Sequence, residues 1–319
     1  MWEPQALRYF EGKVSAPGRV VPPHRLARMI VLVHGYNNDR KQARASYNPL
    51  LGMLPPEDQD AVWQFYWPGY VERITGAATE APLSLAPRYD ERGTESNMLL
   101  SIPSYSAQAL KAPTVGSALG AFLEAASPGS LVLVAHSLGC RVALEAVRHL
   151  RRPRGARKTV LRGACLMAAA VPTYMVETPQ THWWRKPTGG HLVDAARTIE
   201  LSFVLHSTRD RVLQVAFPLG QMAAREGVLP EAVGRHGRPD AAWSARGDTG
   251  VGHSGYWEHP STAPATLRAI GRGAVADLLT LQSVQRVTWR LAAKSDLPDR
   301  SLAARVWHQV GHRQTLTDV

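Results

Sequence analysis

The stretch that most restricts the fold of this chain is SLVLVAHSLGCRVALE, which begins at residue 130. Residues 131–135 are continuously apolar, as in a buried strand, and residues 140–147 repeat apolar side chains at helical spacing. Ser137 lies between the two segments, and the small residues Ala135 and Gly139 stand two positions before and after it. A sharp turn brings backbone and neighbouring strands too close for larger side chains at such positions. The pattern predicts a strand–turn–helix elbow that pushes Ser137 outward.

Apolar runs and helical segments alternate along the rest of the chain. This alternation predicts an α/β fold class, with a mainly parallel central sheet and helices on both faces. Ligands of such sheets bind at the carboxyl ends of the strands. The predicted strands are 29–33, 62–67, 131–135, 160–170 and 199–205, with short edge strands in 7–10 and 20–23; the predicted helices are 40–54, 106–126, 140–147, 192–198, 261–292 and 299–310.

The domain organisation follows from the length of the chain and from the segments that break the alternation. A chain of 319 residues is long enough for one large α/β domain with a sizeable core. We find no internal repeat, low-complexity linker or clear domain boundary, so a single domain over residues 1–319 is predicted. The long segments 68–105 and 172–198 lack sustained periodicity, and loops of that length are usually functional or mobile. We expect them to be cap-like insertions, and residues 261–319 to be a helical C-terminal extension.

The segment around Ser137 resembles the nucleophile elbow of the α/β-hydrolase superfamily, whose pattern is small-x-Ser-x-Gly. Ala135 stands where the first glycine is usual. The run His34-Gly35-Tyr36-Asn37-Asn38 resembles a group of bacterial α/β-hydrolases that are mostly known only as predicted esterases or lipases. The resemblance covers roughly residues 28–260 and implies the α/β-hydrolase fold. It also implies a serine that attacks acyl carbonyls, followed along the chain by an acid and then a histidine.

The predicted acid is Asp210. It comes shortly after the strand at 199–205, in the run HSTRDRV, where it resembles the acid loop of the superfamily. Asp240 and Asp248 remain alternatives, because the acid loop varies in length.

The predicted general base is His253, which lies in the glycine-flanked run GVGHSGYW, 43 positions after the acid. Glycines allow the backbone to fold an imidazole back over the strand ends, and the run precedes the C-terminal helical segment as the histidine loop of the superfamily does. The chain has 12 histidines, and His236 and His259 are the alternatives.

The chemistry also needs hydrogen-bond donors for a developing oxyanion. The resemblance implies that these donors are the backbone N–H groups of Leu138 and Tyr36, and that His34 shapes the loop carrying the second donor. Trp183 and Trp184 lie in the second long insertion, where lids of this superfamily tend to occur. These two tryptophans are therefore the predicted substrate-pocket residues.

Charge and composition restrict the partners. The chain has 37 Lys and Arg residues against 26 Asp and Glu, a net charge of +11. No nucleic-acid motif accompanies the charge, so no nucleic-acid partner is expected, and peripheral contact with an anionic membrane or an acidic partner stays open. Cys140 and Cys165 suit neither a disulfide framework nor a zinc site, and no nucleotide or metal motif is present, so we expect no metal and no cofactor. The absence of a signal peptide or membrane-length apolar run predicts a cytoplasmic protein. The sequence does not predict an oligomeric state.

These features predict a serine hydrolase that cleaves a carboxylic ester or thioester through an acyl-enzyme on Ser137. The substrate would be a small-molecule or lipid ester, as for an esterase or lipase. An acyltransferase or an amidase would use the same residues. The alternative from another class is a non-catalytic binding protein with this fold, which would use its basic surface to bind a partner.

Overall fold

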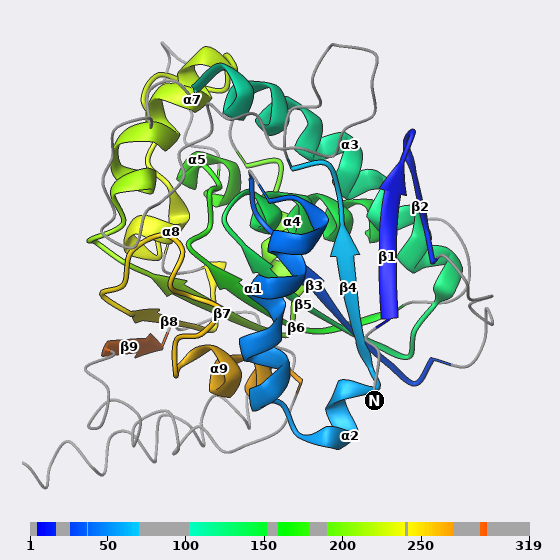
Figure 1. Cartoon of the computed structure of the whole chain (residues 1–319). Helices are drawn as coiled ribbons and strands as arrows, with labels where there is room; N and C mark the ends of the chain where they lie inside the picture. The colour runs from blue at the N-terminus through cyan, green and yellow to red at the C-terminus, as the bar shows by residue number, and fades with distance from the viewer. Residues whose placement is uncertain are drawn as a thin grey trace, which may run out of the picture.

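The computed structural model describes residues 5–16, 26–36, 38–69, 102–151, 159–178, 190–239, 242–270 and 288–291. These residues build a nine-stranded sheet with helices on both sides (Figure 1). The order of the strands is β2-β1-β4-β3-β5-β6-β7-β8-β9. Their bounds are β1 Gln5–Phe10, β2 Lys13–Ser15, β3 Arg28–Val33, β4 Val62–Tyr66, β5 Ser130–His136, β6 Val160–Met167, β7 Leu201–His206, β8 Ala245–Asp248 and β9 Thr288–Leu291.

The sheet is parallel except at its two edges. The seven strands from β1 to β8 in this order pair in parallel, whereas β2 and β9 pair antiparallel with β1 and β8. Strands β3 and β5, at the centre of the sheet, are buried on both faces, which explains their uninterrupted apolar runs. The predicted α/β-hydrolase fold with a mainly parallel sheet is confirmed. All carboxyl ends of the parallel strands lie at one edge, where a site would be expected.

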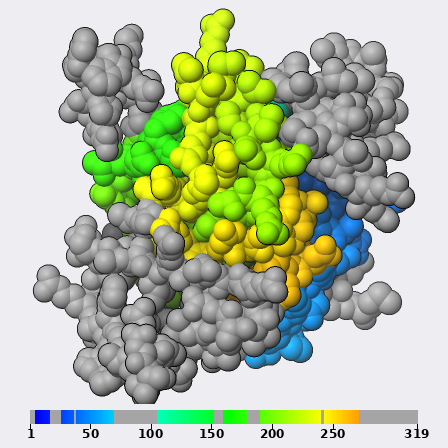
Figure 2. All heavy atoms as spheres, turned by 90° about the vertical axis from the view of Figure 1, so that its left-hand side faces the viewer, coloured from blue at the N-terminus to red at the C-terminus, as the bar shows by residue number. Residues whose placement is uncertain are grey.

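Helices cover both faces of this sheet. Helices α1 (Arg40–Met53) and α9 (Thr262–Ala269) lie on one face, and α3 (Ile102–Ala126), α4 (Leu138–Leu150) and α6 (Val193–Thr198) pack on the other (Figure 1). Short elements connect them: α2 Pro56–Gln59, α5 Thr173–Val176, a π-helical turn Val212–Ala216, α7 Phe217–Ala223 and α8 Val233–His236. Viewed from the left-hand side of Figure 1, yellow-green residues lie above the orange residues that come later in the chain (Figure 2).

The first helix shows how local sequence sets an element boundary. The Asp39 side chain accepts the backbone N–H of Gln42 at 2.8 Å, and the Gln42 side chain accepts the backbone N–H of Asp39 at 2.9 Å. This capping box satisfies two N–H groups that the start of a helix leaves without partners. The loop after β3 therefore ends at Asp39, where α1 begins. This defined end holds the loop at the edge of the sheet.

One prediction about the C-terminal part is wrong. The sequence predicts a helix over residues 261–292; α9 covers Thr262–Ala269, residues 271–287 lie outside the described residues, and residues 288–291 form strand β9 on the open edge of β8. Thr288 and Trp289 are residue types that favour strands, and a sheet edge offers backbone groups for pairing. The helical extension over 261–319 is thus corrected at this strand. The predicted helix at 299–310 lies outside the described residues.

The two predicted insertions are described only in part. Residues 70–101 and 179–189 lie outside the described residues, as does the expected edge strand at 20–23. At its end the first segment is already helical, because α3 begins at Ile102, and the second contains α5 and α6. The cap and the single-domain organisation over 1–319 stay predictions. Within the described residues, no helix is both long and apolar enough to span a membrane.

Candidate active site

Ser137 sits in a sharp elbow between β5 and α4. Its backbone has φ 53° and ψ −126°, a conformation that costs energy for a residue with a side chain. The surrounding backbone holds it there, because the Ser137 N–H donates to the Met167 carbonyl at 2.9 Å and the Ser137 carbonyl accepts the Ala170 N–H at 3.1 Å. A Cβ on Gly139 would lie 2.3 Å from the His34 carbonyl oxygen. The glycine two positions after the serine is thus a steric requirement of the elbow.

The structure brings Ser137 together with the predicted acid and base. The Nε2 atom of His253 lies 2.9 Å from the Ser137 Oγ, and the Nδ1 atom of His253 lies 2.8 Å from the Asp210 Oδ2. These side chains come from the segments that follow β5, β7 and β8. Ser137 and His253 are 116 positions apart in the sequence. The three groups form a continuous serine–imidazole–carboxylate chain.

The carboxylate of Asp210 sets the tautomer of the His253 imidazole. Asp210 is fully buried, and its Oδ1 accepts the backbone N–H of Leu213 at 3.0 Å. Its other oxygen faces His253, and because an ionised carboxylate only accepts, the proton of the neutral imidazole lies on Nδ1. The Nε2 atom then carries a lone pair toward the Ser137 hydroxyl, which is the arrangement of a general base.

The alternative acids and bases that the structure describes make contacts with other partners. Asp248 ends β8 and accepts the Gly250 N–H at 3.0 Å, as a turn-closing side chain. His236 pairs with Glu231 at 3.1 Å, and the Nδ1 of His259 accepts the Ser261 N–H at 3.2 Å. Asp240 lies outside the described residues.

The predicted oxyanion donors lie at the ends of β3 and β5. Leu138 is the first residue of α4, so the helix itself does not use its N–H. The loop after β3 is close to the elbow, because a Cβ on Gly35 would lie 2.8 Å from that of Ser137. Tyr36 follows Gly35, and its ring meets Tyr105 edge to face at 5.5 Å. The oxyanion role of the Leu138 and Tyr36 N–H groups stays a prediction.

His34 holds the loop after β3 and is not placed for proton transfer. Its Nδ1–H donates to the Gly35 carbonyl at 2.9 Å, and its Nε2 accepts the Trp67 N–H at 3.3 Å. The ring stacks on the indole of Trp67 with centroids 5.6 Å apart. Burial lowers the pKa of His34 to about 4, so the ring is neutral at physiological pH and both nitrogens serve the backbone.

One residue of the site was missed by sequence reasoning. His136, directly before the serine, is buried, and its Nε2 lies 2.7 Å from the backbone carbonyl oxygen of His253. Its ring centroid is 5.1 Å from that of His253. The only signal in the sequence is its place beside Ser137, because its partner is a backbone atom 117 positions away.

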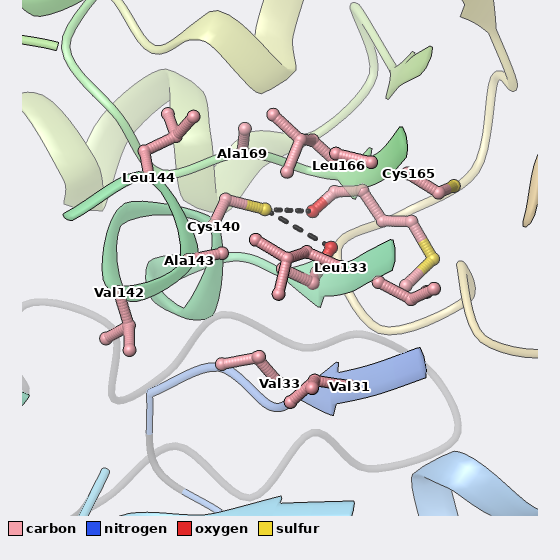
Figure 3. Close-up of a cluster of buried hydrophobic side chains, with 14 of the residues drawn as sticks. Val31, Val33, Leu133, Cys140, Val142, Ala143, Leu144, Cys165, Leu166 and Ala169 are labelled. Carbon is pink, nitrogen blue, oxygen red and sulfur yellow. Dashed lines mark hydrogen bonds between the residues drawn. The ribbon is translucent and has the colours of Figure 1, made fainter. Parts of the chain in front are cut away.

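The two cysteines are unsuited to a nucleophilic role. Cys140, in the first turn of α4, lies in the buried cluster drawn in Figure 3. Its Sγ donates toward the carbonyls of Ala135 at 3.2 Å and Met167 at 3.5 Å. Burial raises the pKa of Cys140 well above its ordinary value and that of Cys165 to about 12, so both stay thiols. Among the described residues no group of three or more His, Cys, Asp or Glu side chains could hold a metal ion. Trp183 and Trp184 lie outside the described residues.

The comparison with family models identifies the family and leaves the activity open. A family model described as "Alpha/beta hydrolase of unknown function (DUF900)" matches residues 19–244. No curated protein matches the chain in sequence. Among solved structures, the lin2722 gene product of Listeria innocua is 10% identical, with a TM-score of 0.34 and coverage of 77% of this chain and 95% of that one. TT1662 from Thermus thermophilus is 18% identical, with a TM-score of 0.32 and coverage of 78% and 90%.

Proposed function

The chain belongs to this α/β-hydrolase family of unknown function, and we propose that it is a serine hydrolase acting on a carboxylic ester or thioester. One observation carries the proposal: the His253 imidazole lies within hydrogen-bond distance of both the Ser137 hydroxyl, at 2.9 Å, and the Asp210 carboxylate, at 2.8 Å. A serine hydroxyl becomes a strong nucleophile only when a neighbouring base can take its proton. Here the base is in hydrogen-bond reach and a buried carboxylate orients it.

The reaction runs in two halves on these residues. The Ser137 Oγ attacks the acyl carbon while its proton passes to the His253 Nε2, and Asp210 stabilises the imidazolium that results. The N–H groups of Leu138 and Tyr36 stabilise the negative charge on the carbonyl oxygen. The bond to the leaving alcohol or thiol then breaks, and the leaving group takes the proton from Nε2. Water attacks the acyl-enzyme by the same proton path and restores Ser137.

The substrate is an ester or thioester of a small molecule or a lipid. We propose that its acyl group binds under the insertions at 68–105 and 172–198, with Trp183 and Trp184 lining an apolar pocket. Loops usually set specificity, whereas a sheet edge positions the reacting groups. Acyl transfer and amide cleavage use the same proton path and differ in which nucleophile resolves the acyl-enzyme.

A fluorophosphonate probe and a series of p-nitrophenyl esters test the proposal. The wild-type chain is expected to be labelled and to hydrolyse esters, and Ser137→Ala should abolish labelling and lower kcat by roughly 10⁴- to 10⁶-fold while leaving the melting temperature near that of the wild type. Ser130→Ala, at the start of β5, is the matched control and should behave as wild type. An unlabelled wild-type chain would contradict the proposal and favour a non-catalytic binding protein.

A further inference from the structure

The ring of His136 connects the strand that carries the nucleophile to the loop that carries the base. Its Nε2 lies 2.7 Å from the backbone carbonyl oxygen of His253. A carbonyl only accepts hydrogen bonds, so the proton lies on Nε2 and His136 is the donor. Burial lowers the pKa of His136 to about 3, which keeps the ring neutral and leaves this single N–H for the carbonyl.

The ring of His136 lies close to two loops of the site. It packs near the rings of Tyr256 and Trp257, which follow His253 in the same loop, with centroids 5.9 and 6.2 Å away. The loop after β3 is also near, because a Cβ on Gly35 would lie 3.2 Å from the His136 Nδ1. The buried imidazole therefore lies close to both the loop after β3 and the loop after β8. A ring packed in this way can transmit its position to the backbone it binds.

The loop that carries the base needs such support. Between β8 and α9, residues 249–261 contain neither helix nor strand, so no ladder of backbone hydrogen bonds fixes the carbonyl of His253. His136, in contrast, ends β5, which pairs on both sides in the centre of the sheet. The hydrogen bond thus connects the backbone of His253 to strand β5, and Ser137 is the residue that directly follows this strand.

We propose that His136 is a positioning residue, which holds the backbone of His253 so that the His253 Nε2 stays in reach of the Ser137 Oγ. The inference rests on the proposed serine hydrolase function. A displacement of about 1 Å between reacting groups can lower a rate about 100-fold, so one hydrogen bond at this point has a large effect on kcat. Substrate binding does not involve the bond, so KM should change little.

Two substitutions separate the hydrogen bond from packing. His136→Gln keeps a neutral N–H donor at a similar reach, and kcat should stay within about 3-fold of wild type. His136→Phe keeps a flat ring and removes the donor, and kcat should fall about 10- to 100-fold while KM changes less than about 3-fold. His149→Phe is the control, because His149 is a partly buried histidine about three turns along α4 that contacts Glu124, and its kcat should equal that of wild type.

A second measurement does not need activity. Hydrogen exchange of peptides covering residues 249–257 should be faster in His136→Phe than in wild type, and unchanged in His136→Gln. Equal kcat and equal exchange in the two variants would overturn the inference, and so would losses of kcat that simply follow losses of melting temperature. A wild-type chain that neither labels nor hydrolyses esters would overturn the proposed function instead, and the exchange data would still decide whether His136 holds the loop.

Discussion

The buried carboxylate of Asp210 permits the sharpest prediction about the proposed mechanism. In Asp210→Asn, the side-chain oxygen is needed by the Leu213 N–H, which donates to Asp210 at 3.0 Å. The amide NH₂ must then face the His253 Nδ1, which in the wild-type chain lies 2.8 Å from the carboxylate oxygen. A donor there forces the imidazole proton onto Nε2, so His253 donates to Ser137 and cannot take its proton. The loss of kcat expected from the wrong tautomer is about 10⁴-fold, or about 5.4 kcal/mol in activation free energy.

Steady-state hydrolysis of a p-nitrophenyl ester measures this effect, with thermal unfolding as the check on the fold. Asp210→Asn keeps the volume of the side chain and both contacts, so stability should change by no more than about 1 kcal/mol. Asp248→Asn is the matched control, because an amide oxygen can still accept the Gly250 N–H that Asp248 binds at 3.0 Å, and its kcat should stay within about 2-fold of wild type. A large loss in Asp248→Asn with an active Asp210→Asn would refute the assignment of the acid.

Two further predictions concern the fold around the site. Gly139→Ala should prevent folding or strongly lower the melting temperature, because its Cβ would lie 2.3 Å from a backbone carbonyl oxygen; Gly52→Ala in α1 meets nothing within 4 Å and should stabilise by about 0.5–1 kcal/mol. Burial lowers the pKa of His34 and of His206 to about 4 and that of His136 to about 3, below the roughly 6.5 of an unfolded chain. The unfolded state therefore binds up to three more protons as pH falls from about 6.5 to about 4, and urea unfolding should show stability dropping by as much as about 4 kcal/mol per pH unit. His136→Gln should reduce that slope by about 1.4 kcal/mol per pH unit, whereas a flat profile between pH 6 and 4.5 would contradict the argument.

The sequence predicted the centre of the sheet because those strands are buried on both faces. The apolar runs of β3, β5 and β7 leave no polar alternation, and β3 and β7 are each followed by a turn cluster. Strand β8, with the residues ARGD, was missed because it has no apolar run. Its conformation comes from pairing with β7 and β9, which is a tertiary effect that a local pattern cannot show.

The candidate site could be predicted to the extent that its residues occur at strand ends. Ser137 and Asp210 follow β5 and β7 directly, so the parallel sheet brings them to one edge. The choice of His253 over 11 other histidines needed the glycine-flanked loop and its order in the chain. His136 could not be found in this way. Its function depends on a contact with a distant backbone carbonyl, and a backbone atom has no sequence signature.

The two histidines that hold the site also affect its electrostatics. Asp210 contacts the ring of His253, whereas the rings of His34 and His136 contact backbone carbonyls. In the proposed mechanism His253 becomes positively charged, and a second charge on His136, with ring centroids 5.1 Å apart, would oppose it by about 3 kcal/mol at an effective dielectric constant of about 20. Burial prevents this, because it lowers the pKa of His136 to about 3. Positive charge can therefore develop at His253, whose imidazole faces the Asp210 carboxylate. A neutral donor at position 136 thus suits the site better than a lysine or arginine would.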